Sequence, residues 1–338
     1  MAGRKLRGAV VGAGSLLGKE LAEELNRAKN VVWDLTLLDA AEAGGQITAA
    51  GDEALVIQPI SADSFAGIDV AFFAGDEATT ASFWKAAHAA GASIVDLTGA
   101  LEGQPQVLVR APSIEGSAAP DLATVAVVSA HPAAVMLALV YARLQPLGLT
   151  RMAATMLQPA SECGSAGVEE VHQQAVGLLT FKPLKKDIYD TQVAFNVVAS
   201  LGDAAKVSLE TVRAKISRHL GVLSGGVAAD TMTLQLIQVP VFHGYTASVF
   251  LEFMGGVEES AVRVALDGGV LQLLDEPSPS NESVAGKDEI LLSMTTTKAK
   301  EGSAFWVWMA ADNLRLAARN AVACAMELAD LRPTSGVN

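Results

Sequence analysis

The fold of this chain is decided by the stretch Gly8-Ala9-Val10-Val11-Gly12-Ala13-Gly14-Ser15-Leu16-Leu17-Gly18. The apolar run Leu6–Gly12 predicts a buried strand, and the pattern over Leu16–Ala28 predicts the helix that follows it. Glycines between a strand and a helix let backbone N–H groups approach a pyrophosphate, whose charge the helix dipole favours. The candidate cofactor-binding residues of this loop are Gly12, Gly14, Ser15 and Gly18.

The spacing of this loop, Gly-x-Gly-x-x-x-Gly, is a weak signal by itself, because the same glycines also serve tight packing of a helix on a sheet. The predicted strand Val32–Leu38 strengthens the nucleotide interpretation, since Asp39 follows it, 21 residues after Gly18. A carboxylate at that point can hold the adenosine ribose diol, and it repels a 2′-phosphate. The sequence therefore predicts NAD in preference to NADP, if a dinucleotide binds.

Strands and helices alternate through the first 130 or so residues. Short apolar strands are predicted at Asp69–Ala74, Ser93–Leu97 and Thr124–Ala130, with a helix over Thr79–Ala90. Such alternation is typical of a parallel sheet covered by helices on both faces. We therefore expect an α/β protein whose first domain is of the Rossmann type.

The pattern changes after Pro132. An alanine-rich helix is predicted over Ala133–Leu147, and two β-rich runs, Thr231–Pro240 and Tyr245–Phe253, are joined by a short turn. Such a pair favours an antiparallel or mixed sheet. A last strand is predicted over Ala304–Ala311, followed by a helix to about Leu331. We expect residues 1–132 and 313–338 to form the Rossmann domain, and residues 133–312 an α+β domain with a mixed sheet.

Composition excludes several classes of protein. The formal net charge of −13 disfavours contact with the phosphates of nucleic acid, so no nucleic-acid partner is expected. The sequence has no apolar run long enough to span a membrane, and its N-terminus does not read as a signal peptide. The two cysteines form no disulfide framework, which favours a cytoplasmic location. The five histidines and two cysteines lack zinc-site spacing, so no metal is expected.

The segment Val127–Met136 is informative for what it lacks. A strand leads there into a helix that begins with Pro132, a geometry that places a nucleophile at the positive end of a helix. The residues offered at that point are Ala133, Ala134 and Val135. None of them can attack a carbonyl group, so the segment resembles an active site without its reactive atom.

Several segments, in order along essentially the whole chain, resemble the aspartate-semialdehyde dehydrogenase family. They are Asp69–Gly75, Ala89–Asp96, Gln238–Tyr245, Val284–Glu289 and Asp312–Val322. The resemblance implies a Rossmann domain, a dimerisation domain and chemistry on an aldehyde that yields or consumes an acyl phosphate. In that family a cysteine attacks the aldehyde, a histidine moves protons, an arginine holds the substrate carboxylate, a glutamine assists, and NADP carries the hydride.

Position by position, the resemblance implies a dismantled site. The nucleophile's position falls at Ala134, the carboxylate-binding arginine's at Gln238 and the acid/base histidine's at Tyr245. Only the assisting glutamine is kept, as Gln158. Within the family, the chain is similar to the degenerate Usg-type paralogues, and the resemblance implies their fold and dimerisation rather than an activity.

The resemblance also implies that anion-binding positions have changed. Glu102 stands where the family has a phosphate-binding arginine, and Met294 and Thr296 stand where it has an Arg-Ile-Arg-like run. The segment Asp39-Ala40-Ala41-Glu42 replaces the Ser-x-Arg-Ser site for the 2′-phosphate of NADP. Two further cofactor contacts are implied, at Gly75 and Asn320.

Other residues are candidates to replace the lost groups. Cys163, in a glycine-flanked loop, is a candidate surrogate nucleophile, although Glu162 beside it should raise the pKa of its thiol. His243 would share a strand face with Tyr245, and could therefore replace the lost histidine. His131 fills the space of an asparagine in the family, whereas His219 is predicted on a helical surface.

Two functions follow from these observations. The first is a non-catalytic homologue that binds NAD or pairs with another protein, as a homodimer or as a heterodimer with an active paralogue. The second is an active NAD-dependent oxidoreductase of amino-acid metabolism that works without a covalent thiol and uses Tyr245 as its acid/base.

Overall fold

The computed structural model describes residues 4–28, 31–40, 45, 47–50, 53–226, 231–296 and 304–331. Glu42 and the C-terminal residues 332–338 lie outside the described residues. The chain divides into two compact units, each taken here by itself. Unit 1 draws on residues 1–112, 116–130 and 317–338, and unit 2 on residues 113–115 and 131–316.

Unit 1 is built on a seven-stranded sheet in the order β5-β2-β1-β6-β7-β9-β8, and every neighbouring pair in it is parallel. The inner strands β6, β7 and β9 are buried along their whole length, which explains the apolar residues at their centres. The strands are β1 (Arg4–Val11), β2 (Val31–Asp39), β5 (Gln58–Pro59), β6 (Val70–Phe73), β7 (Ser93–Asp96), β8 (Val107–Arg110) and β9 (Ala126–Ser129). A separate antiparallel pair is formed by β3 (Ile47–Ala50) and β4 (Glu53–Val56).

Helices cover both faces of this sheet, as the alternation in the sequence predicted. On one face, α1 (Leu16–Arg27) and the unit-1 part of α9 (Asn313–Leu331) pack on β1, β2 and β6 through residues such as Leu21 and Ala321. On the other face, α2 (Glu77–Ala89) and the 3-10 helix η2 (Ala62–Phe65) cover the alternate side chains of the same strands. The parallel α/β architecture of the first domain is thereby confirmed.

Unit 2 contains a six-stranded mixed sheet in the order β11-β10-β12-β15-β14-β13. The predicted mixed sheet is therefore confirmed, and both of the β-rich runs that predicted it are strands of this sheet. The strands β11 (Met232–Gln238) and β12 (Tyr245–Phe253) are not neighbours, because β10 (Leu149–Gln158) lies between them, parallel to β11 and antiparallel to β12. The other strands are β13 (Leu271–Leu273), β14 (Ile290–Thr296) and β15 (Ala304–Ala311).

Two helices of unit 2 pack on each other and on the first strands of this sheet, and they position the candidate site. Helix α3 (Pro132–Leu144) is apolar over most of its length and packs on β10, while α5 (Leu209–Leu223) packs on β11 and on α3. Helix α3 ends in a short 3-10 turn, η3 (Gln145–Leu147), which explains why the predicted helix extended to Leu147. Two shorter helices are α7 (Glu259–Ala265) and α8 (Asn281–Val284).

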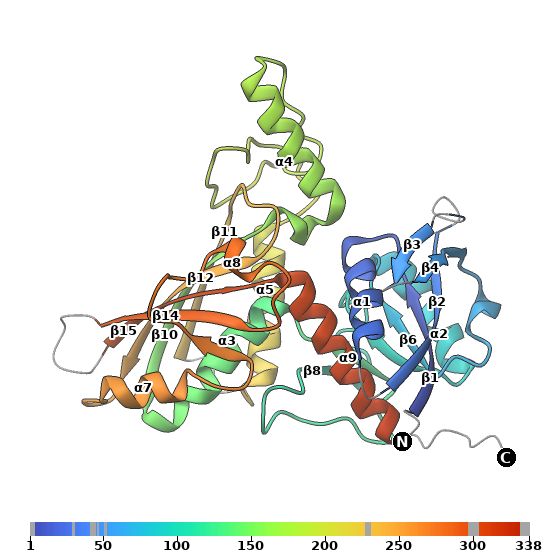
Figure 1. The fold of residues 1–338 in the computed structure, drawn as a ribbon, viewed down its shortest axis with the longest axis horizontal. Coiled ribbons are helices and arrows are strands. Elements are labelled where there is room, and N and C mark those ends of the chain that lie inside the picture. Colours follow the sequence, from blue (N-terminus) through green and yellow to red (C-terminus); the bar gives the residue numbers. More distant parts are fainter. Residues whose placement is uncertain are drawn as a thin grey trace. The chain divides into compact units, whose positions relative to one another are not determined.

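A distinct part of unit 2 is the segment 164–207, which we call the arm. It begins with α4 (Gly164–Leu179), follows the 3-10 helix η4 (Ala160–Cys163), and projects from the sheet in Figure 1. It has a small apolar cluster of its own, which includes Val171, Tyr189 and Val193. None of the helices in the described residues is long and apolar enough to cross a membrane.

Candidate functional site

The glycine loop of unit 1 lies at the point where the strand order of the parallel sheet reverses. Strand β1 has β2 on one side and β6 on the other, and crevices at such switch points are where α/β sheets bind ligands. Gly12 has φ +82°, and a Cβ atom there would lie 2.3 Å from the backbone of Gly75. A Cβ on Gly18 would lie 2.2 Å from the carbonyl oxygen of Gly12. Glycine is therefore required at Gly12 for the loops after β1 and β6 to meet, and at Gly18 for α1 to pack on the loop that precedes it.

Asp39 holds this loop in place. Its Oδ2 accepts a hydrogen bond from the backbone N–H of Gly14 at 2.7 Å, and its Oδ1 accepts from that of Ala40 at 2.8 Å. Ser15 caps α1 by accepting from the N–H of Gly18, and donates its hydroxyl to the carbonyl of Ala74. Asp39 remains half-exposed beside the glycine loop, where a nucleotide ribose would have access to its carboxylate.

The side chain of Asn320 is engaged in hydrogen bonds within unit 1. Its side-chain amide donates to the backbone oxygen of Arg110 at 3.0 Å and to the hydroxyl of Ser129 at 2.9 Å. Nearby, the Arg110 guanidinium forms a two-pronged ion pair with Glu327 at 2.9 and 2.6 Å. These contacts join α9 to the ends of β8 and β9, so a structural role explains Asn320 without a cofactor.

In unit 2, the N-terminus of α3 is capped by His131. Ala133 donates its backbone N–H to His131 Nδ1 at 3.2 Å, and His131 Nε2 lies 2.8 Å from Glu162 Oε1. Because Nδ1 accepts a hydrogen bond, we assign the ring proton to Nε2, which then donates it to the carboxylate. Ala133 and Ala134 are wholly buried behind this cap. The helix end thus presents methyl groups and a capped N–H group, with no nucleophile.

His219 corrects one expectation. It is buried rather than placed on a helical surface, and its Nδ1 accepts the backbone N–H of His131 at 2.8 Å. The reason is that α5 packs directly on α3, so the face of α5 that carries His219 is an interior face. Two histidines and one glutamate therefore form a connected buried cluster at the start of α3.

Three polar side chains lie in a row at one end of the mixed sheet. Gln238 on β11 is opposite Gln158 on β10, and Tyr245 begins β12 next to them. Gln158 donates its amide to Gln238 Oε1 at 3.0 Å, while Gln238 donates its own to the backbone oxygens of Gln158 and Val239. All three side chains are buried. The structure thus brings together three of the residues that the sequence singled out.

Two atoms of this row are left without a hydrogen bond among the described residues, Gln158 Oε1 and the hydroxyl of Tyr245. The ring of Tyr245 contacts that of His131 edge-on, with centroids 5.9 Å apart. Burial, together with the negative charge of nearby Glu162, raises the pKa of Tyr245 well above its usual value. A phenol in this state is a poor match for acid/base work near neutral pH.

Glu162 is the acidic member of the cluster with His131 and His219, and nothing in the sequence indicated that it pairs with His131. Burial acts to raise the pKa of its carboxyl, but the contact with His131, together with the positive charge of Lys215, lowers the pKa overall. Its distance of 31 residues from His131 along the chain explains why no motif revealed the pair.

Cys163 and His243, the two candidate replacements for the lost catalytic groups, do not have the properties that those roles need. Burial raises the pKa of the Cys163 thiol to about 12, with Glu162 and Glu170 adding to the effect, so the thiol stays protonated near neutral pH. This opposes a nucleophilic role. His243 is exposed in the turn before β12, whereas Tyr245 is buried, so the expected shared strand face is wrong.

Comparison with known proteins shows which family the chain resembles. Residues 7–122 match the semialdehyde dehydrogenase NAD-binding domain, and residues 141–316 match the semialdehyde dehydrogenase dimerisation domain. A USG-1 protein homolog of Azotobacter vinelandii is 31% identical, with 96% of both chains covered. The chain belongs to the semialdehyde dehydrogenase family. A second USG-1 protein homolog, from Pseudomonas aeruginosa, is 30% identical over 93% of this chain and 95% of its own.

Relatives named as enzymes lie further away within this family. The aspartate-semialdehyde dehydrogenase of Rickettsia bellii is 26% identical over 96% of this chain and 98% of its own. Among solved structures, a probable aspartate-semialdehyde dehydrogenase from Pseudomonas aeruginosa superposes with a TM-score of 0.84 at 28% identity, covering 96% of this chain and 98% of its own. Aspartate-semialdehyde dehydrogenase II from Vibrio cholerae, 19% identical and with a TM-score of 0.84, shares the fold over 97% of this chain and 99% of its own.

The remaining positions singled out by the resemblance to this family lie in separate places. Glu102 is half-buried in the loop after β7, a loop held by the buried carboxylate of Asp96, which accepts backbone N–H groups including that of Leu101. Met294 is half-buried on β14, and Thr296 ends that strand. Within the described residues no group of three His, Cys, Asp or Glu side chains could hold a metal ion.

Proposed function

We propose that this member of the semialdehyde dehydrogenase family is a non-catalytic, dinucleotide-binding homodimer. The observation that carries the proposal is the start of α3, where buried Ala134 stands at the position of the family's nucleophile and His131 caps the helix. Covalent aldehyde chemistry needs a thiolate, because hydride leaves only from the tetrahedral adduct that the thiolate forms. A methyl group offers no such adduct.

The proposal extends to the groups that surround a nucleophile. Gln238, at the position of the carboxylate-binding arginine, is neutral, and its amide is fully engaged with Gln158 and Val239. Tyr245, at the position of the histidine, has a raised pKa and cannot exchange a proton readily near neutral pH. Substrate anchoring and proton transfer are thus weakened together with the nucleophile.

The nucleotide part of the proposal rests on unit 1. A pyrophosphate would fit the close approach of Gly12 and Gly75 and the start of α1, and the adenosine ribose would fit the carboxylate of Asp39. NAD would supply hydride chemistry when bound. A 2′-phosphate would face the charge of Asp39, so NADP should bind more weakly. The dimer rests on the family match of residues 141–316.

The second function, an active NAD-dependent oxidoreductase that uses Tyr245, has less support. Its favourable observation is the pair of unpaired buried atoms, Gln158 Oε1 and the Tyr245 hydroxyl, which could hold a polar ligand group. The raised pKa of Tyr245 counts against it.

Calorimetric titration of NAD and NADP into the purified protein tests the nucleotide part of the proposal. NAD should bind with higher affinity than NADP, and Asp39→Ala should weaken NAD binding and reduce the preference. Asp34→Ala is the matched control, because Asp34 lies on the same strand but pairs with Lys5 at an exposed site. Tighter binding of NADP to the wild-type protein, or no binding of either nucleotide, would contradict the proposal.

A further inference from the structure

The arm of unit 2 displays apolar side chains that its own chain does not cover. Leu179 and Phe195 are 72% and 67% exposed, and Phe181 is 97% exposed. Single exposed apolar residues are ordinary, but a group of them on one projecting element marks an interaction surface. Lys182 follows Phe181 directly, Lys185 and Lys186 come three residues later, and all three are exposed. Lys185 pairs with Asp187 at 3.5 Å, so this end of the arm keeps a net positive charge in an otherwise acidic chain.

Phe181 is held in an unfavourable backbone conformation. It follows Thr180, the C-terminal cap of α4, and has φ +55°, in the left-handed region where helices usually place glycine. An aromatic residue in this region is strained and persists only where the surroundings impose it. Phe181 thus exposes its aromatic ring to solvent at a position whose backbone conformation favours glycine.

The arm is also unusually well fixed beneath these side chains. Gln174 on α4 is fully buried, accepts the N–H groups of Val193 and Ala194, and donates to the carbonyls of Lys185 and Thr191. Glu170, one turn earlier, accepts the N–H groups of Ile188 and Tyr189. A surface held in this way loses little entropy when it docks.

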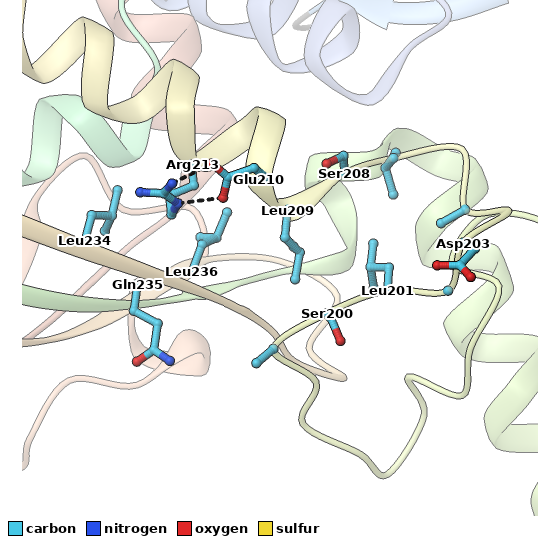
Figure 2. Close-up of a pocket in the computed structure, with 14 residues that line it drawn as sticks. Ser200, Leu201, Asp203, Ser208, Leu209, Glu210, Arg213, Leu234, Gln235 and Leu236 are labelled. Atoms are coloured by element: carbon cyan, nitrogen blue, oxygen red, sulfur yellow. Dashed lines mark hydrogen bonds and ion pairs between the residues drawn. The ribbon is translucent and has the colours of Figure 1, made fainter.

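Unit 2 also contains a hollow that suits such a side chain. A cavity of about 560 Å³ lies between the segment 199–208, the first turns of α5 and the strand β11. Figure 2 shows Leu201, Leu209 and Leu236 reaching it from these three elements, with the Glu210–Arg213 ion pair drawn beside them. Asp203 and Glu210 make two acidic groups against one basic group, Arg213, among the lining residues.

We propose that the aromatic ring of Phe181 in one copy of this chain seats in the Leu201–Leu209–Leu236 cavity of a second copy. The two features are complementary in charge, since Lys182 follows Phe181 and Asp203 gives the cavity an excess negative charge beside the Glu210–Arg213 ion pair. Both lie in the segment that matches the family's dimerisation domain, so a two-fold axis would form the contact twice. The inference rests on the proposed dimer and names the surface through which it forms.

The first test compares the dimer dissociation constants of the wild-type protein, Phe181→Asn and Leu122→Asn by sedimentation velocity. Asparagine tolerates the left-handed backbone, so Phe181→Asn removes the ring without adding strain. Losing a buried aromatic anchor weakens one contact by roughly 30-fold, and hence the two-fold dimer by about 10³-fold. Leu122 is 79% exposed in unit 1 and serves as the control, whose dissociation constant should not change.

The second test separates a docking role from a structural one. Phe181→Asn has an intact cavity, and Leu234→Glu, which places a charge on the cavity-lining part of β11, has an intact Phe181. A mixed dimer of the two keeps one good contact, whereas each homodimer keeps none. Mixing differently tagged variants should therefore produce mixed dimers in excess of both homodimers.

Charge reversal gives a third readout with exposed residues. Lys182→Glu and Asp203→Lys should each weaken the dimer at low salt, and the double variant should recover affinity. A wild-type protein that stays monomeric would overturn the proposed dimer itself. A wild-type dimer that Phe181→Asn leaves unchanged, or mixed variants that form no excess of mixed dimers, would overturn this inference alone and leave the proposed dimer standing.

Discussion

Replacing Gln174 with methionine should loosen the arm while leaving the rest of unit 2 intact. The side chain makes four hydrogen bonds to backbone groups of the segment 185–194, at 2.8, 3.1, 2.8 and 2.9 Å. Methionine has a similar length and no group to replace them. At about 0.5–1.5 kcal/mol for each bond, the arm should lose roughly 2–6 kcal/mol of local stability.

The loss should be visible in hydrogen exchange. The amides of Val193 and Ala194, which bond to Gln174, should exchange from roughly 30-fold to about 10⁴-fold faster, since each 1.4 kcal/mol is a factor of ten. Gln173→Met is the matched control, because Gln173 is exposed and its side-chain amide donates to the carboxylate of Glu169 on the same helix. Unchanged exchange at Val193 and Ala194 in Gln174→Met would refute the argument that buried polar groups of α4 hold the arm.

Three further predictions concern the cluster at α3. Because the pKa of Glu162 is lowered in the folded state, the ionised carboxylate should stabilise the protein above the unfolded pKa of about 4.3, and this contribution should be lost as the pH falls. Urea unfolding measured as a function of pH should therefore show a smaller loss of stability at acid pH for Glu162→Gln than for the wild-type protein. An equal loss in both proteins would contradict this expectation. The Cys163 thiol, with its pKa of about 12, should be alkylated about 10³-fold more slowly at pH 8 than a free cysteine until the protein unfolds; rapid labelling of native protein would count against this. The triple variant Ala134→Cys, Gln238→Arg, Tyr245→His should still show no robust phosphate-dependent reduction of NAD or NADP, since the phosphate-binding positions have changed too; robust turnover would show an otherwise intact pocket.

Much of the fold could be predicted because its signals are local. The bounds of β12 and β15 are those that the runs Tyr245–Phe253 and Ala304–Ala311 predicted, since alternating or continuous apolar residues report directly on burial. The glycine loop likewise predicted the turn between β1 and α1. The order β11-β10-β12 could not be predicted, because β10 is remote in sequence from the two strands that it separates.

The polar cluster shows where sequence reasoning ends. His131 was noted for its place before Pro132, but its bond to Glu162 and the burial of His219 depend on how α5 packs against α3. In the arm, nothing in the sequence distinguishes buried Glu170 from its exposed neighbour Glu169. Residues that a motif carries could be selected in advance, whereas those defined by packing across the fold could not.

We propose that this family member does not carry out covalent aldehyde chemistry. The most direct measurement is the initial rate of phosphate-dependent reduction of NAD or NADP by the wild-type protein with aspartate semialdehyde as substrate. We expect a rate no higher than that without protein, because Ala134 offers no nucleophile and Cys163 remains protonated. Turnover in the ordinary enzymatic range of about 1–10³ s⁻¹ would contradict it.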